Sequence, residues 1–246
     1  VDRAKEKETK GYVYSYDMLG EGARTMRDAD RYYDAYVKAI KVIGKAANGR
    51  GPKRSPGISV KLSAIHPRFE FSHRERAMVD IPPRLKALCM MAKEYDIGLT
   101  VDAEEADRLE LSLDIIEAVF RDDDLNGWTG FGLAVQAYQK RAIHVIEHLR
   151  NLTLEVGRPL MVRLVKGAYW DTEIKLTQQA GLEEFPVFTR KSSTDVSYHA
   201  CANRLLEYRD TIYPQFATHN AYTASVIVEL AGDDKEGFEF QCLHGM

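Results

Sequence analysis

Seven short apolar runs recur along the chain and predict β-strands. The runs are rich in β-branched and aromatic residues, and they are either continuous or alternate with polar positions, as strands do. Turn-forming residues bound most of them. We expect strands over residues 11–19, 57–65, 98–104, 131–138, 160–168, 215–220 and 238–245.

Amphipathic helices are predicted between these runs. Apolar residues return at a spacing of three or four there, so they share one helix face. Pro82 and Pro83 suit a first helical turn, and Gly232 suits a helix end. The predicted buried faces are Leu85, Leu88, Cys89 and Ala92; Leu109, Leu113, Ile116 and Phe120; and Ile143, Ile146 and Leu149.

The alternation of strands and helices predicts a parallel α/β fold. Parallel strands need crossover helices, and they form either an open doubly wound sheet or a closed barrel. A barrel is favoured because no GxGxxG turn occurs and because polar residues follow nearly every predicted strand. These residues are Asp17, Lys61, Asp102, Gln136, Arg163, Lys166, His219 and His244. In a barrel they converge on one mouth.

The predicted architecture is a single TIM-like (βα)8 barrel domain over residues 1–246. Such a barrel closes with eight strands, so the seven that we count predict a last strand and helix beyond Met246. One longer connection, Thr172 to Pro214, looks like an extra loop followed by a helix over Asp195–Tyr208. An insertion at a barrel mouth suits a ligand clamp.

Composition narrows the class of function. The chain of 246 residues is 45% hydrophobic and 29% charged, enough for a large core, and its formal net charge of -3 gives no overall attraction for nucleic acid. No apolar run approaches the ~20 residues of a membrane-spanning helix. Cys89, Cys201 and Cys242 are far apart and lack a CxxC pair. This spacing predicts reduced core thiols in a cytosolic compartment.

Cations inside apolar runs point to an anionic or electron-rich ligand. Arg163 lies in "LMVRLVKGA" and Lys61 lies in "VKLSA". Burying an isolated charge costs several kcal/mol, so each cation must meet a partner. For Arg163 the alternative to a ligand is an ion pair with Asp102 or Glu104. For Lys61 a substrate carboxylate would serve.

Other residues near the predicted mouth suit a heterocyclic ligand that carries phosphate. Gln136 can both donate to and accept from a heterocycle edge, and Trp170 can stack on a planar ring, although helix packing explains a lone Trp equally well. Thr189–Lys191 and Ala217–Asn220 suit phosphate groups. A solvated charge pair and a helix cap at Asn220 are the respective alternatives.

The spacing of the histidines and acidic residues does not predict a metal site. His66 and His73 are not at metal-ligand spacing with any other His or Cys, and no HExxH motif occurs. In "VDAEEAD", Asp102 ends a strand and faces the barrel, so we favour a functional role for it. Helix capping is favoured for Glu105.

A set of ordered motifs resembles a known family. The motifs are "SVKLSAIHPRF", "VDAEEADRLELSLDIIE", "VQAYQKRA", "RLVKGAYWDTEIK", "PVFTRKSSTDVSYHACANRLL", "YPQFATHNAYT" and "FEFQCLHGM". Together they closely resemble the proline dehydrogenase domain of bacterial bifunctional proline utilization A flavoenzymes. The resemblance runs in order from Gly11 to Met246.

The resemblance implies a chemistry and a set of partners. It implies a distorted (βα)8 barrel that holds non-covalent FAD and oxidises L-proline to Δ1-pyrroline-5-carboxylate by hydride transfer. Electrons would pass to a membrane quinone, so the protein would be cytoplasmic and peripherally associated with the membrane. An aldehyde dehydrogenase domain would share the full-length polypeptide, and this domain would not contact nucleic acid.

The resemblance also implies roles for individual residues. Arg163 would lie beside the flavin N5, Asp102 would support the active site, and Lys61 would contact the substrate carboxylate, with Asp17 and Tyr169 near the same pocket. The implied FAD contacts are Val101, Gln136, Val165, Lys166, Gly167, Trp170, Thr189, Arg190, Lys191, Thr218, His219, Gln241, Cys242 and Leu243, the last three near the ADP portion.

The sequence departs from the family at one point, and it also fits two other functions. The last helix of the family supplies two arginines that grip the proline carboxylate and a tyrosine that lines the pocket, and the printed chain contains none of these. A non-catalytic barrel that binds a ligand or partner without turnover is one rival. A phosphate-binding barrel lyase, which would need no flavin, is the other.

Overall fold

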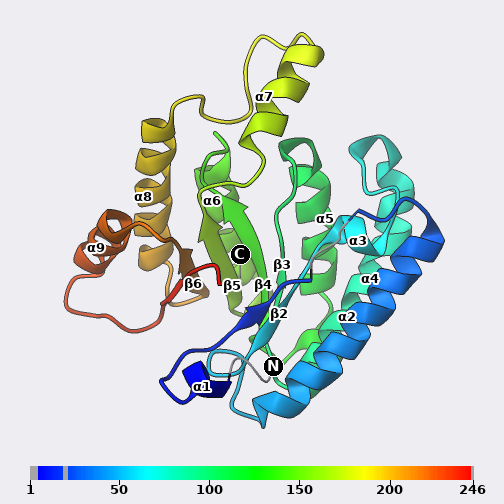
Figure 1. The fold of residues 1–246 in the computed structure, drawn as a ribbon, viewed down its shortest axis with the longest axis vertical. Coiled ribbons are helices and arrows are strands. Elements are labelled where there is room, and N and C mark those ends of the chain that lie inside the picture. Colours follow the sequence, from blue (N-terminus) through cyan, green and yellow to red (C-terminus); the bar gives the residue numbers. More distant parts are fainter. Residues whose placement is uncertain (1–4, 19–21, 245–246) are drawn as a thin grey trace. The chain divides into compact units, whose positions relative to one another are not determined.

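The computed structural model describes residues 5–18 and 22–244, which Figure 1 shows as a coloured ribbon. The chain divides into two compact units. The first contains residues 1–102 and 107–132, and the second contains residues 103–106 and 133–246. Strands and helices alternate in both, so the predicted parallel α/β class is confirmed.

The first unit carries three short parallel strands. Strand β1 pairs with β2, and β2 pairs with β3, both in parallel. The long helices α2, α4 and α5 follow one another as neighbours, α2 against α4 and α4 against α5 (Figure 1). The elements are α1 (Lys5–Glu8), β1 (Ser15–Tyr16), α2 (Met26–Ala47), β2 (Gly57–Val60), α3 (Leu62–Ile65), η2 (Phe71–His73), α4 (Arg74–Glu94), β3 (Leu99–Val101), α5 (Leu109–Phe120) and η4 (Asp123–Leu125).

The second unit repeats this arrangement with longer strands. Strand β5 pairs in parallel with β6, and β6 pairs in parallel with β7. Helix α8 lies between α6 and α9 and also packs on β5 and β6. The elements are β4 (Phe131–Gln136), which begins in the first unit, α6 (Ala142–Val156), β5 (Leu160–Val165), α7 (Trp170–Gln179), α8 (Lys191–Glu207), β6 (Ile212–Ala217), α9 (Ala221–Leu230) and β7 (Glu239–Gln241); the short η3 (Ala106–Arg108) spans the boundary between the units.

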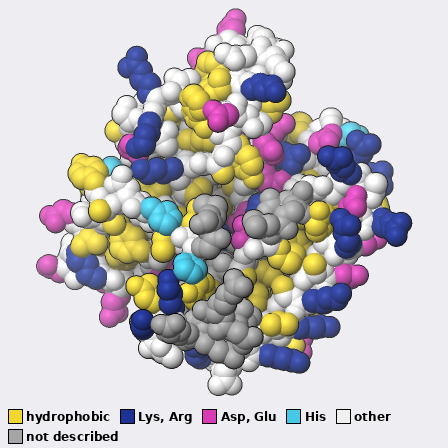
Figure 2. All heavy atoms as spheres, in the orientation of Figure 1, with side chains coloured by type: hydrophobic (Ala, Val, Ile, Leu, Met, Phe, Trp, Pro, Cys, Tyr) yellow, Lys and Arg dark blue, Asp and Glu magenta, His cyan; other side chains and the backbone are white. Residues whose placement is uncertain are grey.

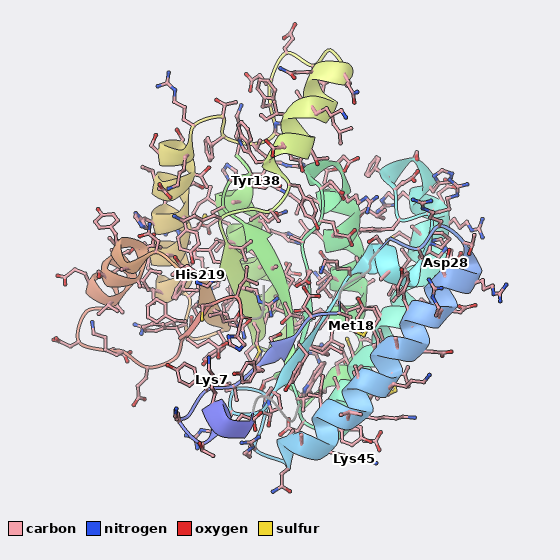
Figure 3. The ribbon with its side chains drawn as sticks, viewed as in Figure 1. Lys7, Met18, Asp28, Lys45, Tyr138 and His219 are labelled. Carbon is pink, nitrogen blue, oxygen red and sulfur yellow. The ribbon has the colours of Figure 1, made fainter. Side chains whose placement is uncertain are left out.

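Helix α2 shows how local sequence fixes an element. Thr25 and Asp28 form a capping box at its start, where the Thr25 side chain accepts from the Asp28 N–H. The Asp28 carboxylate at the start and Lys45 in the last turn also interact favourably with the helix dipole. Figure 3 labels both residues. The apolar stripe of the helix, which includes Tyr36 and Ile40, is buried.

Several predicted boundaries are wrong for identifiable reasons. The run from Gly57 gives a strand only to Val60, because Leu62–Ile65 forms the short helix α3. Strand β6 begins at Ile212 and passes through Pro214, which the prediction had placed outside it. A proline is tolerated there because β7 pairs only with Gln215–Ala217, so no ladder bond on that side is lost.

The predicted helices also need correction. Pro82 and Pro83 lie inside α4 rather than in its first turn. The carbonyl groups that lose their partners belong to the turn around exposed Val79, where water can replace the missing N–H groups. The long connection contains α7 in addition to the expected helix, which begins at Lys191 rather than Asp195. Gly232 does follow a helix end, as predicted, with φ +63°.

The predicted core faces are largely confirmed. Leu85, Leu88, Cys89 and Ala92 are all fully buried. The face of α5 is rotated from the prediction, since Leu111 and Ile115 are buried while Leu109 and Leu113 are only half-buried. Similarly, Ile143 is half-buried beside the buried Ile146 and Leu149. Cys89 and Cys201 are buried as predicted, whereas the prediction for Cys242 is wrong because its side chain is exposed.

The visible surface mixes charged and apolar areas. Figure 2 shows hydrophobic side chains gathered over the region of α9 and the neighbouring β7. Tyr222, Val228, Leu230, Phe240 and Leu243 are the large exposed hydrophobic residues of these segments. Within the described part of the chain, none of the helices combines the length and the apolarity needed to cross a bilayer.

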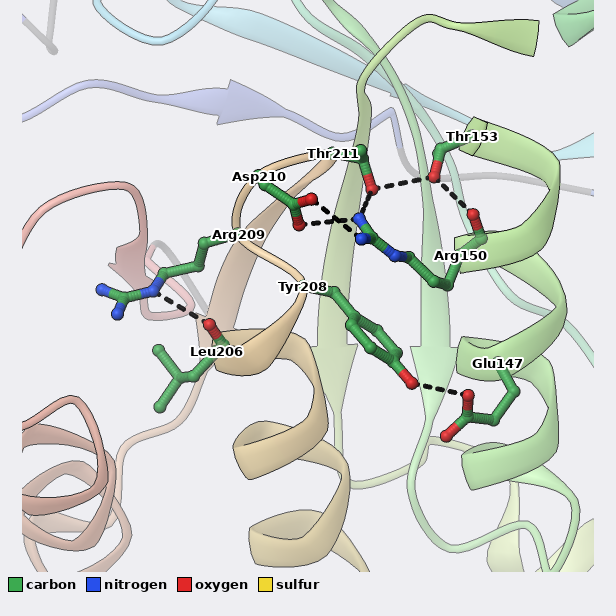
Figure 4. A network of polar contacts seen from close by, with 8 residues as sticks. All are labelled: Glu147, Arg150, Thr153, Leu206, Tyr208, Arg209, Asp210 and Thr211. Carbon is green, nitrogen blue, oxygen red and sulfur yellow. Dashed lines mark hydrogen bonds and ion pairs between the residues drawn. The ribbon is translucent and has the colours of Figure 1, made fainter. Parts of the chain in front are cut away.

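A polar network fastens α6 to the turn between α8 and β6 (Figure 4). The Arg150 guanidinium donates to both carboxylate oxygens of Asp210, at 2.7 and 2.8 Å, and also to the Thr211 hydroxyl. The Tyr208 hydroxyl donates to Glu147 at 2.6 Å. The Arg150 bond lowers the pKa of the Asp210 carboxyl. The network therefore supports the second unit at the end of the sheet opposite to the carboxyl ends of its strands.

Candidate active site

In the first unit, three strand ends bring Lys61 together with two acids. Lys61 directly follows β2, Asp102 directly follows β3, and Asp17 directly follows β1. The Lys61 Nζ lies 2.8 Å from Asp102 Oδ2 and 3.2 Å from Asp17 Oδ1. The Lys61 side chain is 9% exposed. The predicted convergence of these polar residues is therefore confirmed within this unit.

Backbone contacts hold this cluster rigid. The Asp102 N–H donates to the Val60 carbonyl at 2.9 Å, which continues the β2–β3 ladder into the cluster. The Lys61 N–H donates to the hydroxyl of Tyr36, a buried residue of α2. Burial raises the pKa of Tyr36 to about 12, so the phenol stays neutral beside these charges. One cation and two carboxylates give the cluster a formal charge of -1.

In the second unit, Arg163 lies in a polar row across three strands. The register aligns Arg163 with Gln215 and Gln215 with Glu239, on β5, β6 and β7. The Arg163 Nε donates to Gln241 Oε1 at 2.7 Å. Gln241, two residues beyond Glu239, shares its face of β7. The structure thus joins Gln241 to the residue expected beside the flavin N5, a contact not foreseen from the resemblance.

Glu239 anchors the far end of this row. Its carboxylate accepts from Gln241 Nε2 at 2.7 Å, from Gln215 Nε2 at 3.0 Å and from the Tyr213 hydroxyl at 3.3 Å. Burial raises the pKa of Glu239, while these bonds and the Arg163 charge oppose the rise. These donors and the nearby cation compensate the partly buried charge of the Glu239 carboxylate.

The cations expected at phosphate groups share one acid. The carboxylate of Asp195, in the first turns of α8, contacts Lys166 through Oδ1 and Lys191 through Oδ2 at 2.8 Å. The hydrogen bond from Lys166 is the main cause that lowers the Asp195 pKa. Arg190 and Thr189 are exposed next to this group. Three cations and one acid leave a formal charge of +2.

The loop after β5 is held by residues at the end of β4 and just after it. The Gln136 side chain donates to the Glu104 carbonyl at 2.8 Å and accepts from the Ala168 N–H at 3.1 Å. Tyr138, labelled in Figure 3, donates its N–H to the Lys166 carbonyl at 2.7 Å. Gly167 has φ +146°, and a Cβ there would lie 2.4 Å from the Tyr138 ring. Only glycine fits this position.

Three other residues implied for the cofactor, Trp170, Val165 and Val101, lie at the start of α7 and at the ends of β5 and β3. Trp170 begins α7, is 43% exposed and donates its Nε1–H to the Phe188 carbonyl at 3.0 Å. Its indole is therefore fixed yet open on the surface, as stacking requires. Tyr169 caps α7, and Val165, which ends β5, is half-buried. Val101 ends β3 in the first unit and is fully buried.

The ends of β6 and β7 are tied together. The Leu243 N–H donates to Nε2 of His219, another residue labelled in Figure 3, at 3.0 Å. The Thr218 N–H donates to the Gln241 carbonyl at 3.0 Å. The Asn220 side chain accepts from the Thr223 N–H, so Asn220 is the N-cap of α9, one of the two predicted alternatives. Cys242 and His244 are exposed nearby.

Several polar residues of the candidate site were not predicted from the sequence. Among them are Glu239, Gln215 and Asp195. Glu239 was detectable, because period-two spacing places it on the same face as Gln241. Asp195 carried no such signal, because its partner Lys166 lies 29 residues earlier in the chain. Among the described residues, no group of three or more His, Cys, Asp or Glu side chains could hold a metal ion.

Comparison with known proteins identifies the family of this chain. All of residues 1–246 match the family of proline dehydrogenase. The chain belongs to the proline dehydrogenase family. The bifunctional protein PutA of Klebsiella aerogenes is similar to it, at 56% identity over 245 residues, which are 99% of this chain and 19% of that protein. Proline dehydrogenase 1 of Bacillus subtilis is 27% identical over 250 residues, covering all of this chain and 70% of that enzyme.

Solved structures of this family support the fold. A structure of proline utilization A from Bradyrhizobium japonicum superposes with a TM-score of 0.92 and 60% sequence identity, covering 95% of this chain and 24% of that chain. The corresponding Bdellovibrio bacteriovorus structure has a TM-score of 0.93 at 27% identity and covers 100% of this chain and 27% of that one. This chain thus spans about a fifth to a quarter of the PutA relatives' length. Its fold is that of a partial TIM-like barrel, as predicted.

Proposed function

We propose that this chain is the proline dehydrogenase part of a bifunctional enzyme and oxidises L-proline to Δ1-pyrroline-5-carboxylate with FAD. The observation that carries the proposal is the polar row of β5–β7, in which the Arg163 guanidinium is held from one side by Gln241. Proline dehydrogenase family membership supplies the reaction class. The Bdellovibrio relative is inactivated by N-propargylglycine, an amino acid derivative, which agrees with a site for small amino acids.

The residues of the second unit suit FAD. The charge of +2 around Lys166, Arg190 and Lys191 fits a diphosphate, and the fixed, exposed indole of Trp170 offers a stacking surface. Gly167 brings bare backbone to the edge of the loop. We assign the remaining contacts to Val101, Gln136, Val165, Thr189, Thr218, His219, Gln241, Cys242 and Leu243, as the resemblance implies.

FAD, when bound, accepts a hydride from the carbon next to the proline nitrogen and becomes more negative as it is reduced. Arg163 contributes a fixed positive charge where that negative charge develops, which lowers the barrier most when the charge is positioned in advance. Its contact with Gln241 limits the rotation of the guanidinium. Gln136 holds the loop after β5 in place through Ala168.

Lys61 is proposed to contact the carboxylate of proline, with Asp17, Asp102 and Tyr169 near the substrate. In this structure the lysine already has two carboxylate partners. A substrate carboxylate would compete more easily with Asp17, whose side chain is 46% exposed and lies farther from Nζ, than with Asp102, which is 13% exposed. Asp102 would then keep the ammonium in position.

The partners are proposals of the same kind. A quinone in the membrane would take the electrons from the reduced flavin, so we propose a cytoplasmic protein that associates with the membrane at its surface. The PutA relatives are named as bifunctional, which supports an aldehyde dehydrogenase domain in the same polypeptide. The formal net charge of -3 agrees with the absence of a nucleic-acid contact by this domain.

A visible spectrum tests the proposal directly. The purified chain, mixed with FAD and separated from the excess, should be yellow, and L-proline should bleach the flavin band without oxygen. A protein that stays colourless after this treatment would favour the non-catalytic barrel. A flavin band that proline leaves unchanged would refute the substrate while retaining the cofactor.

A further inference from the structure

The contacts of Gln241 connect Arg163 to a carboxylate that has no assigned role. Gln241 Oε1 accepts from Arg163 Nε at 2.7 Å, and Gln241 Nε2 donates to Glu239 Oε1 at 2.7 Å. All three residues belong to the second unit and come from β5 and β7. The amide of Gln241 therefore stands between a cation and an anion, with a short bond to each.

This arrangement leaves the amide one orientation. The guanidinium of Arg163 can only donate, so it requires the oxygen of Gln241. An ionised carboxylate can only accept, so Glu239 requires the nitrogen. Rotating the amide by half a turn would place two donors together at Arg163 and two acceptors together at Glu239. Glu239 thus determines which atom Gln241 presents to Arg163.

Glu239 is itself held in place. Gln215 Nε2 donates to the same Oε1 at 3.0 Å, and the Tyr213 hydroxyl donates to Oε2 at 3.3 Å. Gln215 is 7% exposed and lies in register with both Arg163 and Glu239. A side chain whose rotamer is fixed by two residues of the neighbouring strand β6 can hold its own neighbour in position.

We propose that Glu239 is a positioning residue for the flavin reaction, which acts through Gln241 to hold the guanidinium of Arg163 in its working orientation. The proposal rests on the proposed function of Arg163. It differs from a simple charge effect, because a carboxylate acting alone would oppose the reduction of a nearby flavin. A positioning carboxylate promotes reduction by keeping the cation in place.

The first test is the isosteric variant Glu239→Gln in the FAD-loaded chain, with Glu236→Gln, a change of an exposed acid in the preceding loop, as the control. We expect flavin reduction by proline to slow about tenfold or more, as for loss of a hydrogen bond to a charged group, with the KM for proline little changed. The flavin reduction potential should fall. A rise in the potential would identify a bystander charge and overturn the proposal.

A double-mutant cycle separates positioning from independent effects. If Glu239 acts through Arg163, then Glu239→Gln should change neither the rate nor the potential further in an Arg163→Met background. Additive losses would overturn the proposal. If Glu239→Gln does not fold, Gln241→Met breaks the same connection from the other end and should give the same slow reduction; a normal rate there would also overturn it.

A third test uses the flavin-free chain and does not depend on enzyme activity. Hydrogen exchange of the Arg163 Nε–H, followed by NMR and assigned by its loss in Arg163→Met, should be slow in the parent chain and at least tenfold faster in Glu239→Gln. An unchanged exchange rate contradicts the proposal. If the parent chain binds no FAD, the proposed function fails, whereas this exchange experiment still decides whether Glu239 orients Arg163.

Discussion

The two units hold their central cations in different ways. In the first unit, the Lys61 ammonium contacts the carboxylates of Asp102 and Asp17 directly. In the second unit, an amide stands between the Arg163 guanidinium and the carboxylate of Glu239. A direct ion pair lowers the field of a cation in its surroundings, whereas a neutral amide can orient a cation without adding a negative charge.

The two arrangements differ in their charge and in the group that each of them holds in place. The first cluster has a formal charge of -1 and depends on its lysine to keep two acids together. The second arrangement orients the positive charge that we propose to act on the flavin. We therefore expect changes in the first cluster to affect stability more strongly, and changes in the second to affect reaction rate more strongly.

The largest effect is expected from Arg163→Met. Loss of the positive charge should slow flavin reduction by proline roughly 100-fold or more, while the thermal midpoint shifts little, because methionine keeps the apolar part of the side chain. Stopped-flow absorbance measures the rate and calorimetry the midpoint. The control is Arg204→Met, which removes the partly exposed ion pair between α8 and Glu147 of α6 and should leave the rate unchanged. Parallel losses of rate and stability in Arg163→Met would remove the contrast between the units.

Lys61→Met should lower stability more than Arg163→Met does. Without the ammonium, the Asp17 and Asp102 carboxylates repel each other, and we expect a loss of roughly 2 kcal/mol in the free energy of unfolding. Urea denaturation at pH 7 measures it. Lys61→Arg keeps the charge and should recover most of the loss. If Lys61→Met is as stable as the parent chain, the cluster is not a structural brace.

Arg150→Met tests a region of the second unit away from the proposed chemistry. It removes the paired bonds to Asp210 and the bond to Thr211, and about 1 kcal/mol of unfolding free energy should be lost because Asp210 is 60% exposed. The rate of flavin reduction should not change. Arg121→Met, which breaks the pair with Glu117 within α5, is the matched control and should cost less. A slower reduction in Arg150→Met would show that this network reaches the site.

The smallest effect concerns pH and the buried His66 of the first unit. Burial lowers the pKa of His66, whose Nδ1 accepts from the Arg68 N–H and whose Nε2 faces Asp80, with Arg76 and Arg84 also near. A depressed pKa means that its stabilising contribution is present above the unfolded value of about 6.5 and is lost as the pH falls through the folded value. Unfolding free energies from pH 7.5 to 5 should decline less in His66→Gln. The exposed His219→Gln should retain the parent's decline, and equal slopes in all three proteins would exclude His66 as the cause.

The sequence predicted the framework because strand and helix periods are local properties. Six of the seven predicted runs contain the observed strand, and β6 begins only three residues before its predicted start. The exceptions arise from tertiary context. Pro214 is tolerated in β6 only because β7 pairs with later residues, and Pro82 is tolerated in α4 because the affected turn faces water.

The sequence predicted residues of the candidate site better than it predicted their contacts. Lys61 and Arg163 were found because a cation in an apolar run requires a partner. The identity of that partner depends on register between strands, which the sequence does not specify when several acids are available. A substrate carboxylate was the predicted partner of Lys61, but the structure pairs Lys61 with Asp17 and Asp102. Asp195 was missed because its role depends on Lys166, which is distant in the chain.

The sharing of Asp195 by two lysines affects how ligand binding would respond to salt. A phosphate that approaches Lys166 and Lys191 does not meet bare cations, since it must take the place of a carboxylate that they already hold. Binding is then an exchange of one anion for another, and fewer small ions are released than three basic residues would suggest. FAD affinity should therefore weaken only gently with ionic strength, and it should weaken more steeply once Asp195 is replaced by Asn.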